Sequence, residues 1–311
     1  MKIVLLDKDT LGSVDLSQFN QYGDFISYNK SKKKETLNRV KDADIIITNK
    51  VVIDEKIMKN CENLKLICIA ATGMNNVDLI YAKKLGIEVK NVAGYSTASV
   101  AQATFTLLLS LVGGSCYYDD YVKSGLWSKS PIFTNLDREF FEINGKIWGI
   151  IGLGNIGKAV ANIATAFGAN VIYYSTSGVN RNTQFHRKNL DDLLTNSDII
   201  SIHAPLNSKT DNLIKKTQLA KMKKGSIILN MGRGGIINEA DLAYAIDNFG
   251  ILAGLDVTKT EPIQSENKLL HVEKKESIIF SPHIAWASKE ARKTLVMMIA
   301  DNIENFLKGE N

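Results

Sequence analysis

The stretch Gly152-Leu153-Gly154-Asn155-Ile156-Gly157 decides the fold class of this chain. It follows the apolar run 147–151 and leads into a helical pattern through Ala159, Ile163 and Phe167. A strand that ends at a glycine turn and continues as a helix leaves backbone N–H groups and the positive helix end facing outward, where a pyrophosphate binds. The hexapeptide alone would also suit an ordinary turn, but the flanking strand and helix favour a dinucleotide site.

Each glycine of this turn has its own expected role. Gly152 permits the tight turn, Gly154 lets the backbone approach the phosphates, and Gly157 lets the helix pack closely on the strand. Asn155 and Ile156 open the helix, where N–H groups lack intrahelical partners. We therefore expect these five residues to bind the cofactor.

Composition predicts a globular enzyme without a nucleic-acid or metal partner. The 311 residues are 45% hydrophobic and 23% charged, and the chain is long enough for two domains. The net charge is +5, and the lysine run 30–34 has no interleaved aromatic residues, so it predicts a solvated loop or helix start. Cys61, Cys68 and Cys116 lack metal-ligand spacing and read as free thiols in a reducing compartment.

Two apolar segments bear on location. The stretch 1–7 is too short for the apolar region of a signal peptide, and the region 100–112 is interrupted by four polar residues. We therefore expect a cytoplasmic protein that does not contact a membrane.

Short β-like runs alternate with helical patterns along the chain. Unbroken apolar strands suit a parallel sheet covered on both faces, and the alternation predicts right-handed βαβ units. The expected class is α/β with two doubly wound parallel-sheet domains, a Rossmann dinucleotide-binding domain and a smaller flavodoxin-like substrate domain. The ten predicted strands are 2–7, 43–49, 64–70, 87–92, 146–152, 169–174, 198–204, 225–231, 251–257 and 277–281.

The domain boundaries follow from the position of the glycine motif. We expect a hinge at 94–97, a long helix from Ala98 to about Val112, and a final helix 288–306 that returns to the first domain. The predicted domains are therefore 1–96 with 287–311, which holds the substrate, and 97–286, which binds NAD(P).

Three polar residues follow predicted strands in the second half, at the edge where open parallel sheets bind ligands: Arg233, Glu261 and His283. A histidine can take a hydroxyl proton near neutral pH while hydride leaves the carbon. A carboxylate beside it orients the ring, and a guanidinium holds a substrate carboxylate through two hydrogen bonds. Taken singly, they would equally suit a capped surface histidine, an exposed loop glutamate and an arginine on a glycine turn.

With their flanking residues, these positions resemble the D-isomer-specific 2-hydroxyacid dehydrogenase family over nearly the whole chain. The resemblance rests on Asn230-Met231-Gly232-Arg233-Gly234-Gly235, on Leu255-Asp256-Val257 followed by Glu261-Pro262, and on Ser281-Pro282-His283-Ile284-Ala285-Trp286. It implies that Arg233 binds the substrate carboxylate and carbonyl, that Glu261 partners His283, and that His283 is the acid/base.

The resemblance also implies further contacts. The loop 71–78 would receive the substrate carboxylate on the N–H groups of Thr72 and Gly73, with Lys50 as a second contact, although the same loop also suits a helix N-cap. His203, Pro205 and Asp256 resemble cofactor contacts, Asp256 to the nicotinamide amide. Trp286 fits either a lid over the substrate or a packing residue at the joint between the domains.

The segments 71–78, 94–97 and 100–102 look most like the glycerate dehydrogenase and hydroxypyruvate reductase branch. This analogy favours glycerate/hydroxypyruvate or glyoxylate as the substrate pair. The chain ends at Asn311, so we expect no appended regulatory module. Members of the family commonly form dimers, so the resemblance implies a homodimer. The apolar residues of 100–121 and Trp127 suit either the dimer surface or a core helix.

The cofactor preference stays open between two readings. NAD sites commonly carry an acidic residue about 20 residues after the glycines, whereas this chain has Ser175, Thr176 and Ser177 there. These hydroxyls and Arg181 fit the 2′-phosphate of NADP(H). Alternatively, Arg181 faces solvent and both cofactors bind.

The sequence thus predicts an NAD(P)-dependent oxidoreductase acting on a small D-2-hydroxy acid or its keto acid. A non-catalytic dinucleotide sensor or corepressor on the same fold is the main alternative, and a hydrolase that keeps NAD tightly bound is a third reading. Turnover of small 2-keto acids would distinguish a dehydrogenase from a sensor, and net consumption of free cofactor would distinguish it from the hydrolase.

Overall fold

The computed structural model describes residues 1–309, which form two compact units. Unit 1 comprises residues 1–96 and those from Trp286 onward, and unit 2 comprises residues 97–285. These bounds differ from the predicted domain bounds by one residue, since Trp286 belongs to unit 1. Its ring contacts that of Tyr95 within unit 1, with 6.2 Å between centroids.

Unit 1 is built on a five-stranded parallel sheet in the order β2-β1-β3-β4-β5. This is the flavodoxin-like doubly wound order, which confirms the predicted class for this part of the chain. The strands are β1 (Lys2–Leu5), β2 (Asp24–Ser27), β3 (Ile45–Thr48), β4 (Leu66–Ile69) and β5 (Glu88–Lys90).

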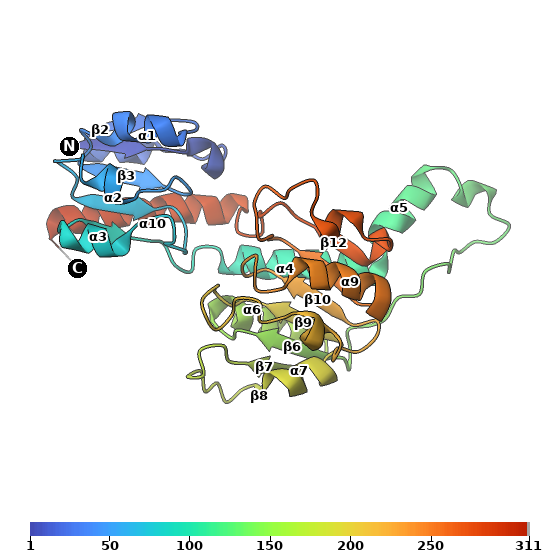
Figure 1. The fold of residues 1–311 in the computed structure, drawn as a ribbon. Helices are drawn as coiled ribbons and strands as arrows, with labels where there is room; N and C mark the ends of the chain where they lie inside the picture. Colours follow the sequence, from blue (N-terminus) through green and yellow to red (C-terminus); the bar gives the residue numbers. More distant parts are fainter. Residues whose placement is uncertain (310–311) are drawn as a thin grey trace. The chain divides into compact units, whose positions relative to one another are not determined.

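Helices cover both faces of that sheet (Figure 1). One face packs against α1 (Lys33–Val40), α2 (Glu55–Met58) and α3 (Leu79–Lys84), and the other packs against α10 (Lys289–Lys308). Helix α10 begins after the N-cap Ser288 and buries Leu295, Ile299 and Ile303, so its apolar repeat was read correctly. The 3₁₀ helices of unit 1 are Lys8–Leu11 and Ser17–Tyr22.

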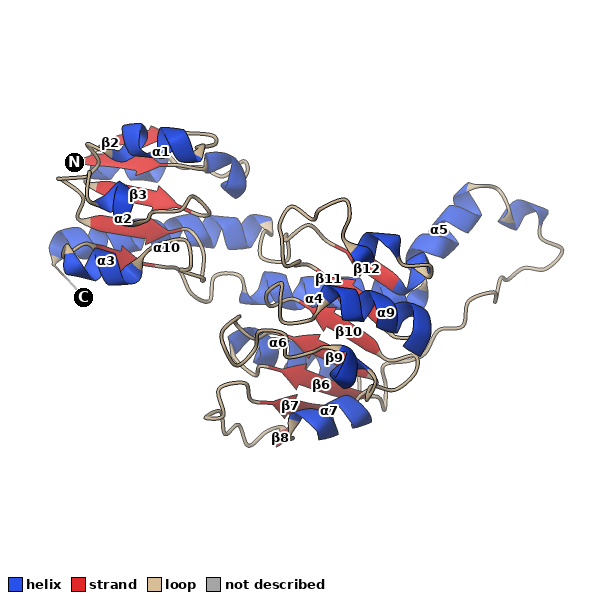
Figure 2. Cartoon of the chain, in the orientation of Figure 1, coloured by secondary structure: helices blue, strands red, loops and turns tan. Residues whose placement is uncertain are grey.

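Unit 2 is built on a seven-stranded parallel sheet in the order β12-β11-β10-β9-β6-β7-β8 (Figure 2). The six strands from β6 to β11 lie in the Rossmann order β8-β7-β6-β9-β10-β11, as predicted, and β12 extends the sheet beyond β11. The strands are β6 (Ile147–Ile151), β7 (Asn170–Tyr174), β8 (His186–Arg187), β9 (Ile199–Ile202), β10 (Ile227–Asn230), β11 (Leu252–Leu255) and β12 (Ile278–Phe280).

The helices of unit 2 also lie on two faces. Helix α4 (Thr97–Gly113) packs on α6 (Asn155–Ala166) through Phe105, whose ring lies 5.0 Å from that of Trp148 and 5.4 Å from that of Phe167. The other helices are α5 (Ser115–Lys123), α7 (Leu190–Asn196), α8 (Lys216–Leu219) and α9 (Glu239–Phe249), with 3₁₀ helices at Trp127–Lys129, Lys268–His271 and Lys275–Ser277.

Two strands were not predicted from the sequence. Strand β2 has only two apolar residues, which are half-buried and lie between the exposed Asp24 and Ser27, and β8 has two exposed residues. Both are edge strands, so they lack the unbroken apolar run that marks the central strands.

The sheet order of unit 2 determines where its loops meet. Parallel strands end at the same edge, and β10, β11 and β12 are neighbours with Asn230 opposite Leu255 and Leu255 opposite Phe280. Since neighbouring strands lie about 4.8 Å apart, side chains that follow these three strands fall within reach of one another.

Residues 114–142 form an arm that projects from the rest of unit 2 (Figure 1). It comprises α5 and the chain that follows it before β6. Within residues 1–309, no single helix has the length and apolar character to cross a membrane. Helices α4 and α5 meet those criteria only as a pair bent by 60°.

Candidate functional site

The glycine turn joins β6 to α6, with Gly154 as the helix N-cap. Gly152 has a φ of 93°, which L residues other than glycine rarely adopt. A Cβ on Gly157 would collide with the carbonyl oxygen of Gly152, so the helix packs closely on the strand. A Cβ on Gly154 would meet open space instead. The turn therefore leaves room beside the helix end for a ligand phosphate, which fits a dinucleotide.

A cavity of about 480 Å³ adjoins this turn in unit 2. Its lining includes seven predicted cofactor residues: Gly152, Gly154, Ser175, Thr176, Ser177, His203 and Pro205. Asn155, Ile156 and Gly157 lie in the first turn of α6 and do not line the cavity. Arg181 does not line it either. Asn180 does, and its side-chain amide donates to the Leu153 carbonyl at 2.6 Å.

His203 carries a polar atom without a partner at this site. Its Nε2 lies 3.0 Å from Ser201 Oγ, which accepts a hydrogen bond from Trp148 Nε1 at 2.9 Å. Its Nδ1 is buried and has no partner within the described chain. Burial lowers the pKa of His203 to about 3, so the ring is neutral near pH 7. A buried ring nitrogen beside the cavity is consistent with a ligand that supplies the missing hydrogen bond.

Arg233 lies in the loop after β10. Its Nη1 donates to the Gly232 carbonyl at 2.8 Å, and the Asn230 side chain holds the loop by donating to the Arg233 carbonyl and accepting from Gly232 N–H. No carboxylate of residues 1–309 lies within 4.0 Å of the guanidinium. Its remaining donors are therefore available to an anionic ligand.

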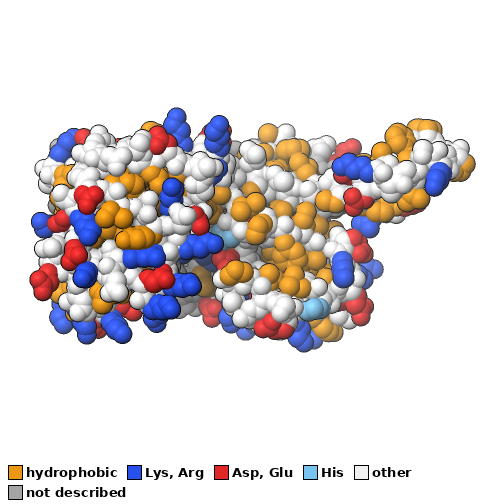
Figure 3. Space-filling model, turned by 90° about the horizontal axis from the view of Figure 1, so that it is seen from above, with side chains coloured by type: hydrophobic (Ala, Val, Ile, Leu, Met, Phe, Trp, Pro, Cys, Tyr) orange, Lys and Arg blue, Asp and Glu red, His pale blue; other side chains and the backbone are white. Residues whose placement is uncertain are grey.

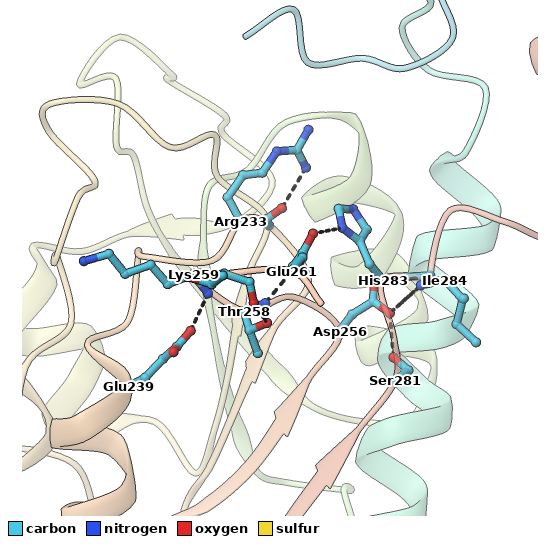
Figure 4. A network of polar contacts seen from close by, with 12 residues as sticks. Arg233, Glu239, Asp256, Thr258, Lys259, Glu261, Ser281, His283 and Ile284 are labelled. Atoms are coloured by element: carbon cyan, nitrogen blue, oxygen red, sulfur yellow. Dashed lines mark hydrogen bonds and ion pairs between the residues drawn. The ribbon is translucent and has the colours of Figure 1, made fainter. Parts of the chain in front are cut away.

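His283 and Glu261 form the hydrogen-bonded pair that the sequence predicted (Figure 4). His283 Nδ1 lies 2.6 Å from Glu261 Oε2, and Thr258 N–H donates to Glu261 Oε1 at 3.1 Å. Because an ionised carboxylate only accepts, the hydrogen of this pair belongs on Nδ1. The geometry leaves Nε2 as the ring atom that can exchange a proton with a substrate.

The backbone of His283 is held in an uncommon conformation, with a φ of 55°. Asp256, which is 4% exposed, accepts hydrogen bonds from Ser281 Oγ and from the N–H groups of Ile284 and Ala285. Its carbonyl accepts from His283 N–H at 2.8 Å. Asp256 thus clamps the histidine loop, a role the sequence did not indicate. Its predicted contact with the nicotinamide amide stays a prediction.

Glu239 supports the site, although the sequence did not indicate it. It accepts hydrogen bonds from Lys259 N–H at 2.5 Å and from the Asn267 side chain at 2.7 Å (Figure 4). It opens α9 and so ties the loop that carries Glu261 to a helix. The hydrogen bond between Lys259 and Glu239 joins residues that are 20 positions apart, and no local sequence pattern predicts such a contact.

The predicted substrate residues of unit 1 lie after β3 and β4. The buried Asp7 carboxylate accepts from the N–H groups of Asn49, Lys50 and Val51, and its burial raises the pKa of Asp7. The Thr72 hydroxyl donates to the Val92 carbonyl, and Thr72 and Gly73 lie in the loop after β4. Trp286 packs against the core of unit 1, and its predicted role as a lid over the substrate stays a prediction.

Comparison with known proteins identifies relatives over the full length. The family model described as D-isomer specific 2-hydroxyacid dehydrogenase, NAD binding domain, matches residues 105–285. The hydroxypyruvate reductase of Blautia hydrogenotrophica is 39% identical over 99% of this chain and 98% of its own. The glycerate dehydrogenase of Methylorubrum extorquens is 35% identical over 99% of this chain and 97% of its own.

A solved structure adds the same fold with a bound nicotinamide cofactor. The acyclic imino acid reductase Bsp5, in complex with NADPH and D-Arg, superposes with a TM-score of 0.88 at 29% identity, covering 100% of this chain and 98% of that one.

Proposed function

Because the chain belongs to the D-isomer specific 2-hydroxyacid dehydrogenase family, in its glycerate dehydrogenase and hydroxypyruvate reductase branch, we propose that it interconverts a small D-2-hydroxy acid and its 2-keto acid. Hydroxypyruvate and glyoxylate are the favoured keto acids. The observation that carries this proposal is the 2.6 Å hydrogen bond between His283 and Glu261, at the sheet edge that also presents Arg233. This set combines a proton-exchanging group with an anion anchor.

The proposed mechanism assigns one role to each side chain. His283 Nε2 takes the hydroxyl proton during oxidation and returns it during reduction, and Glu261 keeps the other proton on Nδ1. Arg233 holds the substrate carboxylate and polarises the carbonyl, with the Thr72 and Gly73 N–H groups as further donors. The nicotinamide cofactor, when bound, supplies or accepts the hydride.

The glycine turn and the cavity would hold that cofactor. Gly154 and the first turn of α6 would face the pyrophosphate, and Ser175 would lie at the ribose. Ser175 to Ser177 offer hydroxyl donors where an acidic residue would repel a 2′-phosphate, so both NAD(H) and NADP(H) belong to the proposal.

The test is turnover followed by loss of reduced-nicotinamide absorbance. NADH and NADPH are each paired with hydroxypyruvate, glyoxylate and pyruvate, and the reverse reaction compares D- with L-glycerate. We expect turnover with D-glycerate only. Arg233→Lys, which keeps the charge but loses the two-pronged geometry, should raise KM at least about 10-fold. Normal KM and kcat in this variant would overturn the role of Arg233.

We further propose a homodimer that forms through the arm 114–142, in the cytoplasm. The arm exposes large apolar side chains, including Phe133 at 88% and Leu136 at 76%, and hydrophobic atoms gather on it in Figure 3. Apolar surface of this kind commonly marks an interface. Light scattering should give about twice the chain mass of 34.4 kDa. Phe133→Asp with Leu136→Asp should give the chain mass, and a monomeric wild type would contradict the proposal.

A further inference from the structure

The cavity beside the glycine turn is free of acidic residues. Its lining includes the hydroxyls of Ser175, Thr176 and Ser177, and no Asp or Glu lines it within residues 1–309. Ser175 is buried at the end of β7, and its Oγ lies 3.5 Å from Ser177 Oγ. A dianionic group placed here would meet hydroxyl donors and no negative side chain.

Lys209 is the single cation on this lining in the described part of the chain. Its backbone is fixed, because Lys209 N–H donates to Asn207 Oδ1 at 2.9 Å, and Asn207 N–H donates to the buried Thr210 hydroxyl at 2.8 Å. That hydroxyl donates in turn to the Pro205 carbonyl at 2.6 Å. No carboxylate of the described chain forms an ion pair with the Lys209 ammonium.

The loop after β7 keeps Arg181 off the cavity. The Tyr173 hydroxyl donates to the carbonyls of Asn180 and Asn182, and the Asn180 amide donates to the Leu153 carbonyl. These contacts turn Asn180 toward the glycine turn. Arg181 is exposed and does not line the cavity.

From this arrangement we propose that Lys209, with the hydroxyls of Thr176 and Ser177, forms a subsite for the 2′-phosphate of NADP(H). The inference deepens the proposed function, because it takes the cavity as the place where the adenosine half of the cofactor binds. In this proposal Lys209, in the loop after β9, recognises the charge of the 2′-phosphate. Arg181, which the sequence offered as one candidate for this role, does not take part.

The experiment measures binding without turnover. Isothermal titration compares adenosine 2′,5′-bisphosphate with adenosine 5′-monophosphate, two probes that differ by the 2′-phosphate alone. The proteins are wild type, Lys209→Ala, Arg181→Ala and Lys188→Ala, the last being an exposed lysine outside the cavity. Circular dichroism checks that each variant folds. Lys209→Arg tests whether a different positively charged side chain at this position keeps the binding.

We expect wild type to bind the bisphosphate at least about 10-fold more tightly than the monophosphate. Lys209→Ala should lose about 10-fold for the bisphosphate and less than about 2-fold for the monophosphate, with both other alanine variants unchanged. Equal losses for both probes, or a loss in Arg181→Ala alone, would overturn the subsite. Absence of keto-acid turnover with this pattern intact would overturn the proposed function but leave the subsite standing.

Discussion

Replacing Glu261 by glutamine would test the acid/base pair with little change in volume. Both carboxylate oxygens are in use, Oε1 by Thr258 N–H at 3.1 Å and Oε2 by His283 Nδ1 at 2.6 Å. Glutamine has one acceptor oxygen and one amide donor. In the variant, either Thr258 N–H or His283 Nδ1–H then faces the amide N–H of the glutamine. Alternatively, the His283 ring changes tautomer and carries its proton on Nε2.

The size of the effect follows from this geometry. A hydrogen bond to a charged group contributes about 1.5–3 kcal/mol. The His283 and Glu261 side chains are 24% and 36% exposed, so water screens part of the interaction and the lower part of that range, about 1.5–2 kcal/mol, applies. A tenfold change in rate corresponds to about 1.4 kcal/mol, so we expect kcat to fall about 10- to 30-fold.

The assay is steady-state reduction of hydroxypyruvate at saturating cofactor. Glu266→Gln is the matched control, because Glu266 lies in the same segment and pairs with Ser265. We expect its kcat to match wild type. Cofactor affinity should be unchanged in both variants. A kcat within twofold of wild type for Glu261→Gln would refute the reasoning.

Three further outcomes are expected. Gly157→Ala should lower stability by about 1–3 kcal/mol and weaken cofactor binding, because its Cβ would push α6 off the Gly152 carbonyl; thermal unfolding with and without NADH would measure both, and an unchanged melting temperature would contradict it. Asp256→Asn should lower kcat more than it changes cofactor affinity, since an amide group cannot accept from Ser281 and two backbone N–H groups together; equal kcat in stopped-flow traces would argue against the clamp. His203 has a lowered folded pKa, so the folded state binds fewer protons than the unfolded chain between pH 6.5 and about 3, and acidification through that window removes stability. The loss is up to about 1.4 kcal/mol per pH unit. Denaturant unfolding of His203→Gln should show a shallower acid dependence, and an identical slope would count against burial as the cause.

The central strands could be predicted from the sequence because strands that are buried on both faces consist of apolar residues. Runs such as 45–47 and 227–229 are unbroken and fully buried, as sheets covered on both faces require. The edge strands β2 and β8 are exposed on one side or both, so their sequences lack an unbroken apolar run. The arm was likewise not predicted as a projecting segment, because its apolar residues look like core residues when read without contacts.

At the candidate site, the sequence indicated the groups that could do chemistry but not those that hold them. Arg233, Glu261 and His283 each follow a strand and stand next to recognisable residues. Glu239 acts through contacts with residues 20 and 28 positions away, and no periodicity encodes such distances. Arg181 is close to Ser175 in the sequence but does not line the cavity, because the lining depends on how the loop folds.

The central claim is that His283 exchanges a proton with a 2-hydroxy acid substrate during hydride transfer. The most direct measurement is kcat for hydroxypyruvate reduction by wild type and His283→Gln, together with NADH and NADPH binding by both. The account predicts turnover by wild type, a loss of about 10²–10⁴-fold in the variant, and equal cofactor binding. Cofactor binding without turnover by wild type, or equal kcat in the two proteins, would contradict it.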